Sequence, residues 1–144
     1  MQIRDLMTPT VVSITPEESV SLAARLLSRH NLGALPVCTY DGELVGIVTD
    51  RDIITRCIAA DQDPKRVPVR DVMTRELTVA APAEDPKQAA KRMASRQVRR
   101  LPVVEAGKVL GMVSLGDLAL ERRCEAEAAA ALSEISENVV RKKK

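Results

Sequence analysis

The stretch RDLMT at residues 4–8 decides how the rest of the chain is read, because it returns as RDVMT at residues 70–74. The offset is 66 positions. LPV at residues 35–37 returns with the same offset, at residues 101–103. Two short words that recur in one order and at one spacing indicate an internal repeat.

A third block supports the repeat and adds one detail. GIVTDRDI at residues 46–53 returns as GMVSLGDL at residues 111–118, now 65 positions later. One residue has therefore been lost between the second and third blocks, which shortens a turn. The chain is best described as two copies of one unit followed by a tail.

Length and composition indicate a folded chain with an aliphatic core. The 144 residues suit one compact domain or two small halves that share a core. Hydrophobic residues make up 45% and charged residues 29%, which favours a globular protein over a disordered one. With one Tyr and no Phe or Trp, any flat ligand is expected to lie against aliphatic side chains and backbone.

Charge and cysteine content indicate which kinds of partner and which cellular compartment to expect. The net charge of +2 comes from 22 basic and 20 acidic residues, which is too balanced to indicate a nucleic-acid partner. Three cysteines without paired metal-ligand spacing are typical of reduced thiols, so we expect a cytoplasmic protein. The first residues show no apolar signal segment, and no run approaches the roughly 20 apolar residues of a membrane span.

The first copy, expected over residues 1–60, opens with a short β-rich run at residues 11–14. A helix is predicted to follow, with Thr15 as its N-cap and Pro16 at its first position. Apolar residues at helical spacing continue it through residue 27. Gly33 is expected to end it in the left-handed conformation.

The same copy then predicts a hairpin and a second helix. Residues 34–40 and 44–48 are rich in β-branched and aliphatic side chains, and Asp41 and Gly42 form a tight-turn signal between them. Thr49 is placed to cap the helix that follows. The order of elements is β-α-β-β-α, and residues 61–69, which contain two prolines, form a linker.

The second copy, expected over residues 70–121, repeats this order with a changed helix start. Residues 77–80 match the first strand, but the position of Thr15 is now Ala81, so that cap is lost. The helix is predicted to start late, with Asp85 as N-cap and Pro86 at the first position. The hairpin returns with its turn at Ala106 and Gly107.

The tail, residues 122–144, is predicted to be helical because it is rich in Ala, Glu and Arg. Ala128, Leu132 and Ile135 give it a thin apolar stripe. Two interpretations stay open at this point. The tail is either a solvated extension with a frayed basic end, or a helix that packs on the module or on a partner subunit.

These repeated blocks resemble the cystathionine β-synthase (CBS) domain family, in particular stand-alone bacterial CBS-pair proteins. The family's units run β-α-β-β-α and carry a Leu-Pro-Val strand followed by Gly-x-hydrophobic-Thr/Ser-x-x-Asp. The resemblance covers the chain to about residue 121. It implies an α+β fold of two repeats packed about a pseudo-twofold axis with two clefts between them, adenosine-type ligands in those clefts, and a homodimer in the form of a flat disc.

Thr49 and Asp52 are the first candidate ligand residues. They lie where a strand turns into a helix, and the N–H groups of a helix N-terminus favour an anion. The Thr hydroxyl can donate to a phosphate, and the Asp carboxylate can accept both hydroxyls of a ribose. The competing interpretation is that Thr-x-x-Asp is a plain capping box.

Arg99 and Arg100 are the second candidate, because guanidinium groups bind phosphate well. The aligned positions in the first copy are Gly33 and Ala34, which carry no charge. By the family resemblance, the two arginines would complete the cleft of Thr49 and Asp52 in one competent site. Ordinary surface charge is the competing interpretation.

The remaining site residues follow from the same resemblance. The opposite cleft, with Ser114 and Asp117, would lack cations and be the weaker one. The adenine is expected against Val12, Ile14 and the backbone of their strand.

The predicted function is a regulatory module that binds an adenine nucleotide, AMP, ADP or ATP, with S-adenosylmethionine ranked behind them. It would act alone or on a protein partner that the sequence does not identify. The alternative is a non-binding dimerisation module with vestigial clefts. An enzyme is not expected, because one His, no metal-ligand cluster and no nucleophile–base pattern leave no catalytic group. No required cofactor, metal, nucleic acid or membrane partner is expected, and Cys38 is expected to be buried.

Overall fold

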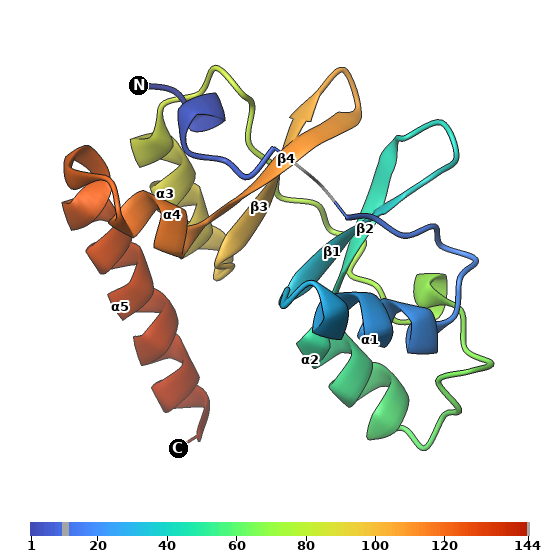
Figure 1. The fold of residues 1–144 in the computed structure, drawn as a ribbon. Coiled ribbons are helices and arrows are strands. Elements are labelled where there is room, and N and C mark those ends of the chain that lie inside the picture. Colours follow the sequence, from blue (N-terminus) through green and yellow to red (C-terminus); the bar gives the residue numbers. More distant parts are fainter. Residues whose placement is uncertain (10–11, 144) are drawn as a thin grey trace. The chain divides into compact units, whose positions relative to one another are not determined.

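The computed structural model describes residues 1–9 and 12–143, and these form two compact units. The copy-1 unit comprises Val11–Leu77 with Gly107–Val109. The copy-2 unit comprises Met1–Thr10, Thr78–Ala106 and Leu110–Lys144. Each has its own aliphatic core and a two-stranded antiparallel sheet with helices beside it (Figure 1), which confirms the predicted α+β class and the duplication.

The copy-1 unit is built around the hairpin of β1 (Ala34–Cys38) and β2 (Leu44–Thr49). Helix α1 (Val20–Arg29) precedes the hairpin, and α2 (Asp50–Ile53) follows it and continues as the π-helical turn η2 (Ile54–Ile58). The turn is where the sequence predicts it, because Gly42 has φ +84°. The predicted strand at 11–14 is a single parallel bridge from Ile14 to Val37, and its first residue lies outside the described range.

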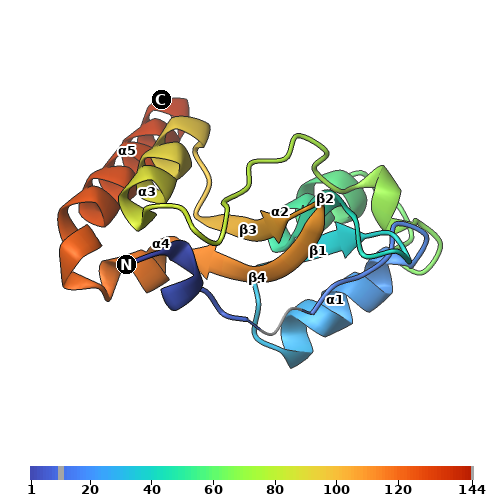
Figure 2. The same cartoon turned by 90° about the horizontal axis from the view of Figure 1, so that it is seen from above.

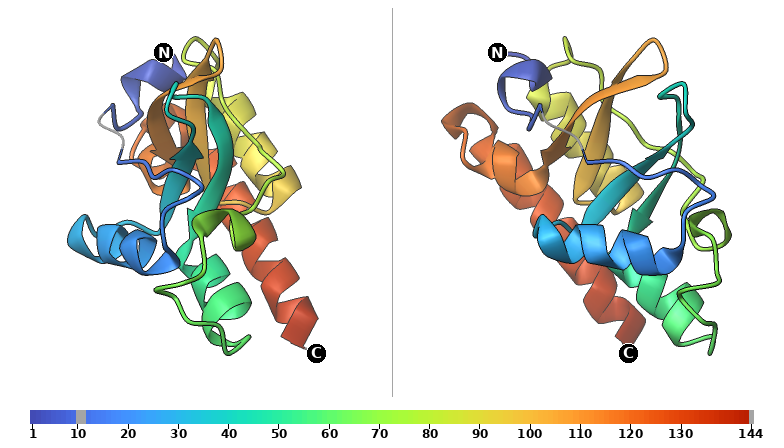
Figure 3. Two further views of the ribbon diagram at one scale, coloured as in Figure 1. Left: turned by 90° about the vertical axis from the view of Figure 1, so that its right-hand side faces the viewer. Right: turned by 45° about the vertical axis from the view of Figure 1, so that its right-hand side comes forward.

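Helix α1 begins four residues later than expected from Thr15 and Pro16. Its N-cap is Ser19, whose side chain accepts a hydrogen bond from the Leu22 N–H at 3.1 Å. The segment of η3 (Val69–Asp71) runs beside the chain that leads into α1 (Figure 3). The Glu18 carbonyl accepts from the Val69 N–H at 2.8 Å, which holds the chain before Ser19. Val69 is 51 positions from Glu18, so the local capping signal could not show this contact.

The end of α1 also differs from the prediction. Asn31, with φ +53°, takes the left-handed conformation that was expected of Gly33. Its equivalent in the other unit, Gln97, has φ +58°. A polar residue with a left-handed backbone therefore ends the first helix of both copies.

The copy-2 unit repeats the arrangement with α3 (Pro86–Arg96), β3 (Arg100–Glu105), β4 (Lys108–Ser114) and α4 (Leu115–Ala119). Here the predicted helix start is confirmed, since Asp85 caps α3 through the Lys87 N–H at 2.9 Å and Pro86 is the first residue. The predicted first strand is again one parallel bridge, from Ala80 to Val103.

The tail forms η4 (Arg122–Cys124) and α5 (Glu125–Lys143), and α5 runs along α3 (Figure 2). Cys124, Ala128, Ala131 and Ile135 are buried in the core of the copy-2 unit. The tail is therefore a packed helix of this unit rather than a fully solvated extension. Leu132, predicted in the same stripe, is 47% exposed, and the last residue lies outside the described range.

Each unit takes its leading RD(L/V)MT word from the other sequence copy. In the copy-1 unit Thr74 pairs with Ile47, with N–H···O distances of 2.7 and 3.0 Å. In the copy-2 unit Thr8 pairs with Met112, at 2.8 and 3.1 Å. The repeated segment thus adds one isolated antiparallel bridge to each hairpin, and its place is fixed by residues of the other copy.

Candidate ligand-binding turns

The Thr49–Asp52 turn is a complete capping box. Thr49 Oγ1 accepts from the Asp52 N–H at 3.0 Å, and Asp52 Oδ2 accepts from the Thr49 N–H at 3.0 Å. Strand β2 delivers Thr49 to the start of α2, so both side chains lie at the helix N-terminus. The structural interpretation of Thr-x-x-Asp is therefore satisfied, whatever further role the pair has.

Asp52 has two more partners that the sequence did not suggest. The Thr74 hydroxyl lies 3.2 Å from both carboxylate oxygens and donates to them. Arg56 Nε lies 3.9 Å from Oδ1, while its Nη1 donates to the carbonyls of Val72 and Met73. Asp52 is 7% exposed as a result. The sequence hinted at these contacts only through the Met-Thr pair that both copies share, Met7-Thr8 and Met73-Thr74.

The Ser114–Asp117 turn of the copy-2 unit has the same box. Ser114 Oγ accepts from the Asp117 N–H at 3.0 Å, and Asp117 Oδ2 accepts from the Ser114 N–H at 2.8 Å. Asp117 is only partly buried. Exposure thus favours Asp117 as a ligand acceptor, whereas the neighbouring cations led the sequence analysis to favour Asp52.

Arg99 and Arg100 are both exposed at the start of β3. The Arg99 carbonyl accepts from the Leu115 N–H at 2.8 Å, which fixes its backbone beside the Ser114–Asp117 turn of its own unit. The equivalent bond in the copy-1 unit joins the Gly33 carbonyl to the Asp50 N–H at 3.2 Å. Within one unit, the structure therefore brings Arg99 next to Ser114, and uncharged Gly33 next to Thr49.

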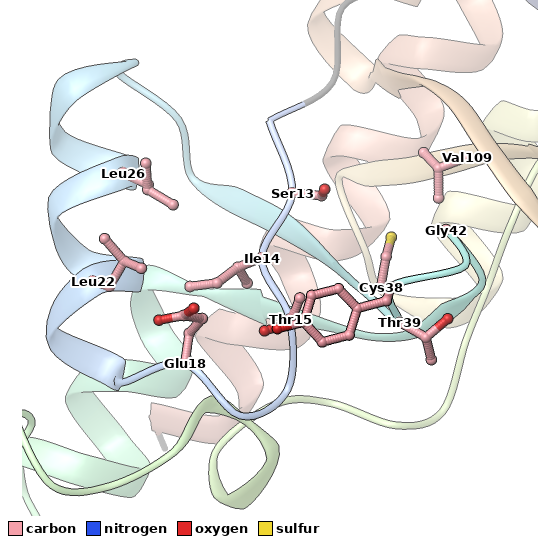
Figure 4. A pocket seen from close by; sticks show the side chains of 11 residues that line it. Ser13, Ile14, Thr15, Glu18, Leu22, Leu26, Cys38, Thr39, Gly42 and Val109 are labelled. Carbon is pink, nitrogen blue, oxygen red and sulfur yellow. The ribbon is translucent and has the colours of Figure 1, made fainter.

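Val12 and Ile14 belong to the copy-1 unit. Ile14 is buried in its core, and Val12 is half-buried against the same cluster. Ile14 also lines a pocket in this unit, together with Glu18 and Cys38 (Figure 4). Tyr40 belongs to the same lining. Sequence reasoning missed Glu18 and Tyr40. The one available signal was that the chain's single aromatic residue stands beside a hairpin turn.

The three cysteines lie in the interior of the described structure. Cys38, Cys57 and Cys124 are buried, as predicted for Cys38, and burial raises the pKa of each thiol, so the neutral form dominates near neutral pH. Within residues 1–9 and 12–143, no three His, Cys, Asp or Glu side chains gather where they could hold a metal ion. No helix in this part of the chain is long and apolar enough to cross a bilayer.

Two small α+β repeats, each with a Thr/Ser-x-x-Asp turn between hairpin and helix, define a tandem-repeat module. The CBS domain family matches residues 3–58 and 69–123. The chain therefore belongs to the CBS domain family.

Relatives support this assignment over nearly the whole chain. The CBS domain-containing protein YhcV of Bacillus subtilis is 40% identical over 134 residues, which cover 93% of this chain and 94% of YhcV. Hypoxic response protein 1 of Mycobacterium tuberculosis is 31% identical over 116 residues, 81% of each chain.

Solved structures are similar in fold. The crystal structure of hypoxic response protein I with two coordinated zinc ions has a TM-score of 0.78 and 30% identity, and covers 84% of this chain and 98% of that one. The CBS domain pair of protein MJ0100, in complex with 5′-methylthioadenosine and S-adenosyl-L-methionine, has a TM-score of 0.74 and 28% identity. That match covers 83% of this chain and 94% of the MJ0100 chain.

Proposed function

We propose that this chain is a regulatory module that binds an adenine nucleotide, AMP, ADP or ATP, and catalyses no reaction. The observation that carries the proposal is the duplicated Thr/Ser-x-x-Asp turn, kept with the same hydrogen bonds in both units. The MJ0100 domain pair, similar in fold, was crystallised with two adenosine derivatives, which supports a ligand of this class.

We assign the ribose, the phosphates and the adenine of the nucleotide to different groups of residues. Thr49 and Asp52 would contact the ribose and the nearest phosphate, with Arg99 and Arg100 neutralising the phosphates. The exposure of both arginines leaves their guanidinium groups available. Val12 and Ile14 would provide aliphatic contacts for the adenine, and Ser114 with Asp117 would form the weaker second site. Self-association as a homodimer in the cytoplasm is part of the same proposal.

Substitution with calorimetric titration tests the roles. Asp52→Ala, or Arg99→Ala with Arg100→Ala, should abolish ATP binding. Asp117→Ala is the matched control, because it breaks the same capping box in the other unit. Equal loss from Asp117→Ala and Asp52→Ala would refute the assignment of the stronger site to Asp52.

One observation favours a second function, a non-binding dimerisation module. Asp52 is 7% exposed and its two oxygens already accept from Thr49 and Thr74. Thermal unfolding separates the two functions. A ligand at 100 times its Kd stabilises a protein by about 2.7 kcal/mol. No shift with AMP, ATP, 5′-methylthioadenosine or S-adenosylmethionine would favour the non-binding module.

A further inference from the structure

A pocket lies inside the copy-1 unit, beside the pre-α1 segment and the β1 hairpin. The pocket has a volume of about 450 Å³, within the usual range of about 300–1,000 Å³ for small-molecule sites. Its walls come from the segment before α1, from α1 itself and from the end of β1 with its turn. Of the residues proposed for the nucleotide, Ile14 alone lines it.

One wall of the pocket is apolar. Ile14 is 5% exposed and forms part of the core, while Leu22 and Leu26 of α1 are half-buried (Figure 4). Leu22 and Leu26 pack against the core cluster yet keep surface on the pocket side. This wall can take up the hydrocarbon body of a ligand, which gains free energy as apolar surface leaves water.

The pocket carries one formal negative charge. Glu18 is exposed, and among the side chains that the structure describes its carboxylate has no hydrogen-bond or ion-pair partner. Its backbone is held at both ends, because its N–H donates to the Thr15 carbonyl at 3.3 Å and its carbonyl accepts from Val69 at 2.8 Å. The backbone of Glu18 is therefore fixed beside the pocket, and its carboxylate belongs to the lining.

Nothing among the described lining side chains is basic. Lys108 lies next to the lining at Gly42, with Nζ 3.8 Å from where a Cβ on that glycine would be. Its ammonium group donates to the Asp41 carbonyl. The other polar groups of the lining are hydroxyls and a thiol, which are neutral. Among the lining side chains that the structure describes, Glu18 alone carries a formal charge, so the lining itself favours a cation over an anion such as a nucleotide phosphate.

Tyr40 adds a ring to the lining. It is the only aromatic residue of the chain, and it is 93% exposed, so it packs on almost nothing. A ring face attracts a nearby cation, typically by about 0.5–1 kcal/mol at exposed sites. An aliphatic wall, an unpaired carboxylate and a free ring together suit an ammonium group on an apolar body.

We propose that this pocket binds a small organic cation, an amine or quaternary ammonium carried on a hydrocarbon body, through Glu18, Tyr40 and the Leu22–Leu26 wall. The site is separate in chemistry from the proposed nucleotide site, and it stands whether or not a nucleotide binds. The chain would then respond to a second ligand of opposite charge.

Three probes with one hydrocarbon body test the charge preference: cyclohexylmethylammonium, cyclohexylmethanol and cyclohexylacetate. Calorimetry on the full chain measures affinity. Tyrosine emission reports the location directly, since Tyr40 is the only tyrosine and the chain has no Trp. The cation should bind saturably and change the emission, the alcohol should bind more weakly, and the carboxylate should not bind.

Glu18→Gln with Glu17→Gln as matched control tests the residue. Both carboxylates are exposed and adjacent, but only Glu18 lines the pocket. Glu18→Gln should weaken the cation about fivefold, the upper range for an exposed ion pair, and Glu17→Gln should change it less than twofold. Equal losses in the two variants, equal binding of cation and carboxylate, or no saturable binding of the cation would overturn the proposal.

Discussion

Replacement of Gly111 by Ala tests the contact between the repeated segment at residues 4–8 and strand β4 of the second hairpin. This contact is the bridge from Thr8 to Met112. Gly111 lies in β4 with an ordinary backbone conformation, so it is needed only for space. A Cβ at this position would lie 2.5 Å from the Thr8 carbonyl oxygen and 2.9 Å from Met7 Sδ. The oxygen belongs to the backbone bridge with Met112 and cannot move without breaking it.

The equivalent change, Gly46→Ala, should cost less. Its Cβ would meet the flexible end of Met73 first, at 2.7 Å, and the Thr74 carbonyl oxygen only at 3.1 Å. Overpacking typically costs about 1–3 kcal/mol. We therefore expect a loss in unfolding free energy of about 3 kcal/mol for Gly111→Ala and about 1.5 kcal/mol for Gly46→Ala. At roughly 3 °C per kcal/mol, the melting temperature falls by about 9 °C and 4 °C.

Urea unfolding followed by far-ultraviolet circular dichroism measures both changes, and Gly116→Ala is the control. Gly116 is in the first turn of α4, and a Cβ there meets nothing closer than Ser114 Oγ at 3.6 Å. Since Ala is a better helix former than Gly, this variant should gain about 0.5 kcal/mol. A Gly111→Ala protein as stable as the parent, or less affected than Gly46→Ala, would refute the bridge geometry.

Three further changes follow from the structure. Arg92→Leu should lower the unfolding free energy by about 2 kcal/mol. Arg92 donates to Glu84 and to the Val79 carbonyl, and its loss leaves the half-buried Glu84 carboxylate without its charged partner. Burial alone raises the pKa of Glu84, but hydrogen bonds from Arg92 and the Ala81 N–H outweigh it and lower the pKa below the usual 4.5. Its stabilising effect is therefore complete above about pH 4.5 and lost as the pH falls through the lowered pKa; urea titrations from pH 7 to pH 3 should show this loss in the parent and not in Arg92→Leu. Ser19→Ala should lower the unfolding free energy by about 1 kcal/mol, because it removes the N-cap of α1, and Thr15→Ala should lower it less. Equal losses in the two variants would support the helix start at Thr15 that the sequence predicts. Ile135→Ala should lower the unfolding free energy by about 2–4 kcal/mol, because Ile135 of α5 is buried in the core. An unchanged unfolding free energy in urea would mean that α5 does not contribute to the core.

The repeat made most of the fold predictable. Asp85 and Pro86 are local signals that predict the start of α3, and the structure confirms that start. The start of α1 carries an equally good signal at Thr15, yet the helix begins at Val20. The difference lies in η3, whose backbone binds the carbonyls before Ser19, and no local pattern reports such a distant partner.

The candidate turns were found because both copies keep the pattern Thr/Ser-x-x-Asp at the start of their second helix. Their hydrogen bonds to each other follow from that pattern, whereas the burial of Asp52 depends on Thr74 and Arg56. The exchange of leading words between copies could not be inferred, since either copy's word fits either hairpin by sequence. The pocket beside Tyr40 was missed because its wall gathers side chains from segments more than 20 residues apart.

Calorimetric titration of ATP and AMP into the purified chain tests whether this module binds an adenine nucleotide. We expect saturable binding with about one site per chain, lost in Asp52→Ala and kept in Asp117→Ala. Absence of binding heat for both nucleotides, together with an unchanged melting temperature at millimolar concentrations of each, would contradict it.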